Sequence, residues 1–168
     1  EFLVEQKTIC ISDIDTRHLT KILRDEGCKI GAIYPTQHFT DEEAISEIKK
    51  FGSMDGKNFT ENVAVSAPYN FGDPGTKKKY KIVAVDFGIK ENILRIMKSL
   101  GGDIEVVPPN TSAETIKSLN PDGIFLSNGP GDPSVLQDAI KEVKKMMSLG
   151  LPIFGICLGH QIMSLAYG

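Results

Sequence analysis

The strongest constraint on the fold is an alternation of apolar strands and amphipathic helices in the second half of the chain. Short apolar runs that predict strands occur at 81–87, 104–107, 123–127 and 151–156. The intervening segments carry apolar residues at helical spacing, over 92–100, 112–119 and 135–149. Such alternation predicts βαβ units, and therefore an α/β fold with a parallel sheet covered on both faces. Functional loops of such a sheet lie at the carboxyl ends of its strands.

A polar, Gly/Pro-rich segment precedes this alternation. Residues 71–79 combine turn residues with three consecutive lysines, which is typical of a solvated connection between domains. We therefore predict part of a small α/β N-terminal domain over residues 1–70, a linker over 71–79 and the parallel-sheet domain over 80–168.

The N-terminal domain is expected to contain one short strand, at 9–12, and two capped helices. Asp15 offers an N-cap for the first helix, which Gly27 ends. Thr40 and Glu43 form the sequence pattern of a capping box at the start of the second. The first helix carries an apolar stripe of Leu19, Ile22 and Leu23.

Charge and cysteine usage exclude several classes of function. The formal net charge is −3 with mixed signs, so the basic stripe that binds nucleic acid is missing. The three cysteines follow no CxxC or Cys/His pattern, which argues against a disulfide framework and a metal site. No apolar run approaches the roughly 18 residues that span a bilayer. We expect a cytoplasmic protein that binds neither nucleic acid nor membrane.

The last predicted strand runs directly into a cysteine flanked by glycines. Gly155-Ile156-Cys157-Leu158-Gly159 has the form of a nucleophile elbow, in which a sharp strand-to-helix turn raises the reactive side chain above the sheet. The helix N-terminus favours the nucleophilic thiolate. The N–H of Leu158 would point at the oxyanion of a tetrahedral intermediate. The alternative is that Cys157 is a small buried hydrophobe, but a structural joint does not need the polar His160 and Gln161 that follow.

A second glycine-rich loop follows the third predicted strand. Residues 127–133 read Ser-Asn-Gly-Pro-Gly-Asp-Pro and lie next to the elbow in this topology. The glycines Gly129 and Gly131 could offer N–H groups to an oxyanion and let a substrate approach the backbone. Turn chemistry alone also explains most of these residues, so a tight structural turn remains an alternative.

Together, the elbow and the glycine loop resemble the nucleophile motif and glutamine-contacting loop of the class I glutamine amidotransferases. Residues 13–21, which contain Ile-Asp-Thr-Arg, and residues 85–95 narrow the resemblance to the small, glutamine-hydrolysing subunits of carbamoyl-phosphate synthetases. The fold implied is a flavodoxin-like amidotransferase domain, here truncated, with part of the small-subunit N-terminal domain before it.

The resemblance implies a role for each matching residue. Cys157 would attack the side-chain amide of L-glutamine, giving a γ-glutamyl thioester and ammonia. Gly129 and Leu158 would supply oxyanion N–H groups, and Gly131 and Gln161 would hold glutamine. The ammonia would pass to a large synthetase subunit for pyrimidine and arginine synthesis. That subunit uses ATP and Mg, whereas this chain needs no metal or organic cofactor.

One element of the family's site is missing from this sequence. The family's base comes from a His-x-Glu pair downstream of the nucleophile, and none of His18, His38 and His160 is followed by Glu at that spacing. The chain also starts without Met and stops soon after Cys157. We therefore expect an internal fragment that hydrolyses glutamine negligibly by itself. A stand-alone Cys hydrolase or isomerase, and a non-catalytic interaction module, remain alternatives.

Overall fold

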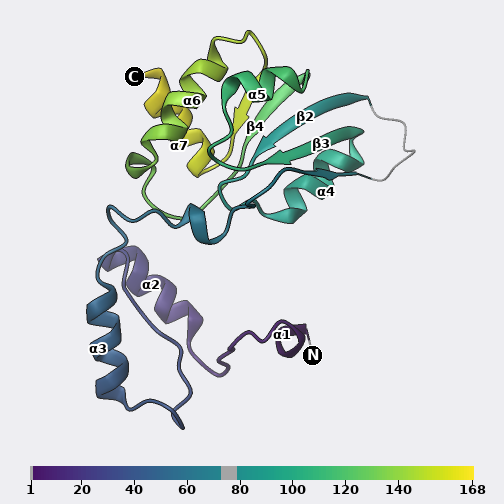
Figure 1. Cartoon of the computed structure of the whole chain (residues 1–168). Helices are drawn as coiled ribbons and strands as arrows, with labels where there is room; N and C mark the ends of the chain where they lie inside the picture. The colour runs from purple at the N-terminus through teal and green to yellow at the C-terminus, as the bar shows by residue number, and fades with distance from the viewer. Residues whose placement is uncertain (1, 73–78) are drawn as a thin grey trace. The chain divides into compact units, whose positions relative to one another are not determined.

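A computed structural model describes residues 2–72 and 79–168. The chain divides into two compact units, Glu1–Ser53 and Met54–Gly168, which are considered separately (Figure 1). The predicted linker lies partly outside the described residues, because positions 73–78 are not among them.

The second unit is built on a five-stranded sheet in the order β1-β3-β2-β4-β5. Four of the strands are parallel to one another, as the alternation of strands and helices predicts, and β1 pairs antiparallel with β3. The parallel strands have the flavodoxin-like order. Strand β2 lies between β3 and β4, so the chain adds β3 on one side of β2 and then crosses over to add β4 on the other. The strands are β1 (Tyr69–Phe71), β2 (Tyr80–Val85), β3 (Gly102–Val107), β4 (Gly123–Leu126) and β5 (Ile153–Gly155).

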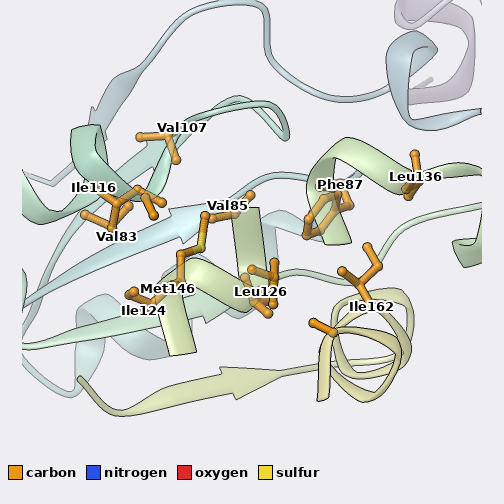
Figure 2. Packing of buried hydrophobic residues seen from close by; sticks show 14 of the residues in the cluster. Val83, Val85, Phe87, Val107, Ile116, Ile124, Leu126, Leu136, Met146 and Ile162 are labelled. Carbon is orange, nitrogen blue, oxygen red and sulfur yellow. The ribbon is translucent and has the colours of Figure 1, made fainter. Parts of the chain in front are cut away.

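Three helices cover one face of this sheet (Figure 1). They are α5 (Ala113–Ser118), α6 (Gln137–Met147) and α7 (Leu158–Tyr167). Alternate residues of β2 point into this layer, where Val83 and Val85 are almost fully buried. Figure 2 shows these valines in the same cluster as Leu126 of β4, Met146 of α6 and Ile162 of α7. This cluster is the larger of the two hydrophobic cores and lies directly beneath the carboxyl ends of β2 and β4.

Helix α4 (Glu91–Ser99) packs on the opposite face. Its Leu94 is fully buried against Ala84 of β2 and Ile104 of β3. Phe125 of β4 is also buried on this face, but the neighbouring Phe154 of β5 is 65% exposed although its ring stacks on Phe125 at 6.3 Å. The cover supplied by the described residues on this face therefore thins toward β5.

The first unit consists of helices and loops over its described residues. Helices α1 (Phe2–Glu5), α2 (Thr16–Glu26) and α3 (Asp41–Phe51) form it. The predicted caps are confirmed: Asp15 accepts a hydrogen bond from the N–H of His18, and Thr40 and Glu43 form a reciprocal capping box. Ala44 is the one buried hydrophobic residue among positions 2–53.

Several predicted features differ from the structure. The strand expected at 9–12 is wrong: this segment has no regular secondary structure, and it does not pair with the sheet that the described residues form. The helix expected at 135–149 begins at Gln137, after a 3₁₀ turn at Pro133–Val135. Strand β1, which has three residues, was not predicted.

The predicted domain division does not coincide with the compact units. Residues 54–72, which we expected in the N-terminal domain or at the start of the linker, belong to the second unit. Strand β1 holds them there by pairing with β3, and the N–H of Val65 donates to Asp86 at 2.9 Å. The linker at 71–79 stays a prediction.

Candidate active site

Cys157 lies in a strained turn between β5 and α7. Its backbone has φ 51° and ψ −113°, a left-handed conformation that costs a non-glycine residue roughly 1–3 kcal/mol. The turn is held on both sides of the cysteine. The N–H of Ile156 donates to the carbonyl of Leu126 at 3.0 Å, and the N–H of Gly159 donates to that of Ser127 at 3.0 Å. The thiol side chain is exposed, so the turn presents it to solvent as a nucleophile elbow does.

Both glycines of the elbow allow a close approach of backbone segments. A Cβ on Gly155 would lie 2.7 Å from the nitrogen of His160, where the strand enters beneath the helix. A Cβ on Gly159 would overlap the carbonyl of Leu126 and lie 2.7 Å from the carbonyl oxygen of Ser127. Backbone atoms cannot move aside as a flexible side chain can. Glycine is therefore required at both positions, for the steric reason predicted from the sequence.

The N-terminus of α7 leaves a backbone donor free beside the thiol. Leu158 is the first helical residue and its N–H has no acceptor among the described residues, whereas the next N–H, of Gly159, is bonded to Ser127. The Leu158 side chain is buried in the larger core, which fixes the orientation of this peptide. This geometry is suited to binding an oxyanion next to Cys157.

Gly129 lies against the elbow, on the loop that follows β4. A Cβ on Gly129 would overlap the carbonyl oxygen of Phe87 and lie 2.8 Å from Cδ2 of Leu158. Its N–H, too, has no acceptor within the described part of the chain. Two of the predicted oxyanion donors, Gly129 and Leu158, are therefore neighbours in space although 29 positions separate them in the sequence.

The remainder of this loop is ordered by Asp132 and packs against an earlier segment. The Asp132 carboxylate accepts a hydrogen bond from the N–H of Ser134 at 2.8 Å. The pKa of this carboxyl is held below its ordinary value, mainly by its hydrogen bonds with Ser134 and to a smaller extent by one from the N–H of Gly56. Gly131, with φ 97°, approaches the carbonyl of Lys57 and the ring of Phe59, so its neighbours come from residues the sequence did not single out.

Gln161 and His160 both lie in the first turn of α7. The N–H of Gln161 donates to the carbonyl of Cys157 at 3.0 Å, and its side chain is exposed on the elbow helix. His160 is exposed as well. From the sequence we favour a structural role for His160, with a hydrogen bond on the elbow helix, over a catalytic one. Its imidazole forms no hydrogen bond with a described residue, although its backbone carbonyl accepts one from Oγ of Ser164.

Comparison with known proteins places this site in a family. A sequence profile described as "Glutamine amidotransferase class-I" matches residues 83–168, a segment that contains the elbow and the glycine loop. The chain belongs to this family. Its sheet, parallel except for β1, agrees with the flavodoxin-like amidotransferase fold that the sequence predicted.

Curated relatives of this amidotransferase chain extend the similarity to its whole length. A carbamoyl phosphate synthase small chain of Neisseria meningitidis serogroup B is 47% identical over 100% of the chain and 47% of its own length. The carbamoyl phosphate synthase small chain of Acinetobacter baylyi is 43% identical, again over 100% of the chain and 47% of its own length. The chain thus spans about half the length of the curated relatives it matches. Among solved structures, a Thermoplasma acidophilum protein, described as one of the subunits of a GMP synthase, aligns with 52% of this chain and 45% of its own, at 31% identity and a TM-score of 0.46.

Three polar residues at the site of the amidotransferase chain were not predicted to have a role. Asp86 directly follows β2, and Ser127 and Asn128 follow β4; their side chains hydrogen-bond the backbone between Phe87 and Lys90. A lone carboxylate directly after an apolar strand is a signal that could have identified Asp86, since a buried charge is rarely left without partners.

A separate cleft of about 620 Å³ opens elsewhere on the second unit of the amidotransferase chain. The polar groups of its wall include those of Asn58, Glu61, Asn110 and Gln137, and none of the predicted site residues lines it.

Over residues 2–72 and 79–168, no three His, Cys, Asp or Glu side chains are grouped so as to hold a metal ion. Nor is any helix in those ranges long and apolar enough to cross a membrane.

Proposed function

We propose that the protein is the glutamine-hydrolysing subunit of a carbamoyl-phosphate synthetase. The observation that carries this proposal is the similarity to relatives of that name over the entire chain, including residues 1–82, which the family profile does not cover. Amidotransferases serving other pathways share the nucleophile motif, so the similarity of residues 1–82 is what supports this assignment over the others.

The proposed chemistry begins at Cys157. Its thiolate attacks the side-chain amide carbon of L-glutamine, and the tetrahedral oxyanion accepts hydrogen bonds from the N–H groups of Leu158 and Gly129. Collapse of this intermediate breaks the carbon–nitrogen bond, and the nitrogen leaves as ammonia after it gains a proton. Water then hydrolyses the γ-glutamyl thioester to glutamate and restores the thiol. Gly131 and Gln161 are proposed to contact the glutamine.

The base for these proton transfers is proposed to lie in a His-x-Glu pair of the longer protein. His160 is adjacent to the elbow and exposed on α7. It forms no ion pair with a carboxylate among the described residues. A thiol–imidazole enzyme needs an oriented base that accepts and then returns a proton. The 168-residue chain alone is therefore expected to be inactive.

The proposal extends to a partner. Ammonia released at Cys157 would be used by a large synthetase subunit, which would also supply the ATP and Mg chemistry, in the cytoplasm. Under this proposal the product serves pyrimidine and arginine synthesis. The first unit, which buries little of its own apolar surface, is a candidate contact region for the large subunit.

A glutamine-analogue diazo-ketone tests this assignment on the full-length protein. We expect the analogue to modify Cys157 stoichiometrically, with protection by glutamine, because the analogue reaches the thiol only when the substrate site orients it. Mass spectrometry of the digested protein locates the adduct. The exposed Cys10 and Cys28 serve as internal controls and should remain unmodified by the analogue. Ready modification of Cys157 by iodoacetamide, with no reaction of the analogue, would favour a Cys hydrolase or isomerase of another kind.

A further inference from the structure

The turn that follows β2 lies at the switch point of the sheet, between the carboxyl ends of β2 and β4. Asp86 is the first residue of this turn and is only 2% exposed. Its Oδ1 accepts hydrogen bonds from the N–H groups of Gly88 at 2.8 Å and Ile89 at 2.7 Å. Its Oδ2 accepts one from the N–H of Val65 at 2.9 Å. One buried carboxylate thus fixes the shape of the turn and ties it to the segment before β1.

The other side of the turn is bonded to the glycine loop. The N–H of Phe87 donates to Oγ of Ser127 at 2.8 Å. Nδ2 of Asn128 donates to the carbonyl of Gly88 at 3.0 Å, and Oδ1 of Asn128 accepts from the N–H of Lys90 at 3.1 Å. These bonds join the 86–90 turn to the two residues that immediately precede Gly129.

The turn also meets Gly129 directly. The carbonyl of Phe87 lies so close that a Cβ on Gly129 would overlap it. A Cβ on Gly88 would lie 3.4 Å from Cα of Gly129 and 3.0 Å from Cδ of Pro130. Any change in the path of the turn must therefore shift the peptide of Gly129, because close-packed backbone has no free volume to absorb the change.

We infer that Asp86 is a positioning residue for glutamine hydrolysis, which holds the N–H of Gly129 in register with that of Leu158. This inference rests on the proposed function. Asp86 does not touch substrate; it acts through the backbone of residues 87–90. Transition-state hydrogen bonds depend on such placement, since removal of one oxyanion donor lowers kcat by about 10²–10³-fold.

Asp86→Asn in the full-length protein tests the inference. The amide keeps the shape of the carboxyl and one acceptor oxygen, but it places an NH₂ donor against one of the N–H donors. We expect kcat for glutamine hydrolysis to fall roughly 10- to 100-fold, with KM changed less than about twofold. The rate of Cys157 alkylation by iodoacetamide should stay within about twofold of the unmodified protein, because alkylation forms no oxyanion.

Asp122→Asn is the matched control. Asp122 also accepts a backbone hydrogen bond, from Lys81 at 2.7 Å, but at the opposite end of β2 and from an exposed position. It should leave kcat unchanged. If Asp86→Asn does not fold, Ser127→Ala cuts the bond between Phe87 and the glycine loop, and the same selective fall in kcat is expected.

Three outcomes have distinct meanings. An unchanged kcat in a folded Asp86→Asn protein, or in Ser127→Ala where that variant replaces it, would overturn the inference. A rise in KM that accounts for the whole loss, together with an altered alkylation rate, would overturn it as well, because it would indicate general distortion. If the unmodified full-length protein releases no ammonia from glutamine, the proposed function itself fails.

Discussion

Replacing Cys157 by serine is expected, under the proposed function, to abolish glutamine-dependent carbamoyl phosphate synthesis by the full-length protein assembled with a large synthetase subunit. A hydroxyl at this position is a much weaker nucleophile, and loss of a catalytic nucleophile lowers turnover by roughly 10³-fold or more. Synthesis from added ammonia should persist, since ammonia bypasses the elbow. The two rates, measured on the same preparation, separate loss of glutamine hydrolysis from loss of assembly.

The other two cysteines provide the control for this substitution. Cys10 and Cys28 are exposed and lie in the first unit, remote in sequence from the elbow. Cys10→Ser and Cys28→Ser should leave both rates near those of the unmodified protein. Glutamine-dependent synthesis that survives in Cys157→Ser would contradict the assignment of the nucleophile.

Gly159→Ala is expected to have the second large effect, on the fold of the elbow itself. The added Cβ would lie 2.5 Å from the carbonyl carbon of Leu126 and 2.7 Å from the carbonyl oxygen of Ser127. Separating them would stretch the hydrogen bond from Gly159 to Ser127 and displace the N-terminus of α7. We expect the free energy of unfolding to fall on the order of 3 kcal/mol, and the melting temperature by about 10 °C.

Gly123→Ala is the matched control for overpacking. Gly123 begins β4, the strand that leads to the glycine loop, but a Cβ there would meet its nearest neighbour, the carbonyl oxygen of Pro152, at 3.4 Å. This is ordinary van der Waals contact, so the melting temperature should change little. Equal melting temperatures for Gly159→Ala and Gly123→Ala would show that the approach of α7 to β4 is not as close as described.

The parallel sheet could be predicted because its strands and helices differ in hydrophobic period. Runs such as Ile82–Val85 are buried on both faces and therefore read as continuous apolar segments. Strand β1 could not be predicted in this way, since its three residues are exposed or half-buried and its pairing with β3 depends on tertiary context. The α6 boundary was missed because Pro133 starts a separate 3₁₀ turn.

In the first unit the predicted helix caps are confirmed, whereas the sequence did not show how its helices pack. The caps at Asp15 and Thr40 depend on residues within one turn, so the sequence is sufficient to place them. The apolar stripe of α2 predicts which face of a helix tends to be buried, not what buries it. Leu19 and Leu23 of that stripe remain 46% and 41% exposed.

For the site, sequence motifs identified residues that need a special backbone but not those that support it. Gly129, Cys157 and Gly159 lie in two motifs whose glycines are required for steric reasons, and the structure places these two segments together. Asp86 lies in a stretch that supports the resemblance, but the sequence alone did not assign it a role. That role depends on its burial and on the N–H groups of Val65, Gly88 and Ile89, and these contacts form only in the folded chain.

Trapping the covalent intermediate shows whether Cys157 forms a bond with glutamine. Full-length protein is mixed with glutamine, quenched in acid within its first turnovers, digested and analysed by mass spectrometry. We predict a peptide containing Cys157 whose mass is increased by one γ-glutamyl group, and no such peptide from Cys157→Ser. Ammonia release at a normal rate with no adduct on Cys157, or with the adduct on another residue, would exclude Cys157 as the nucleophile.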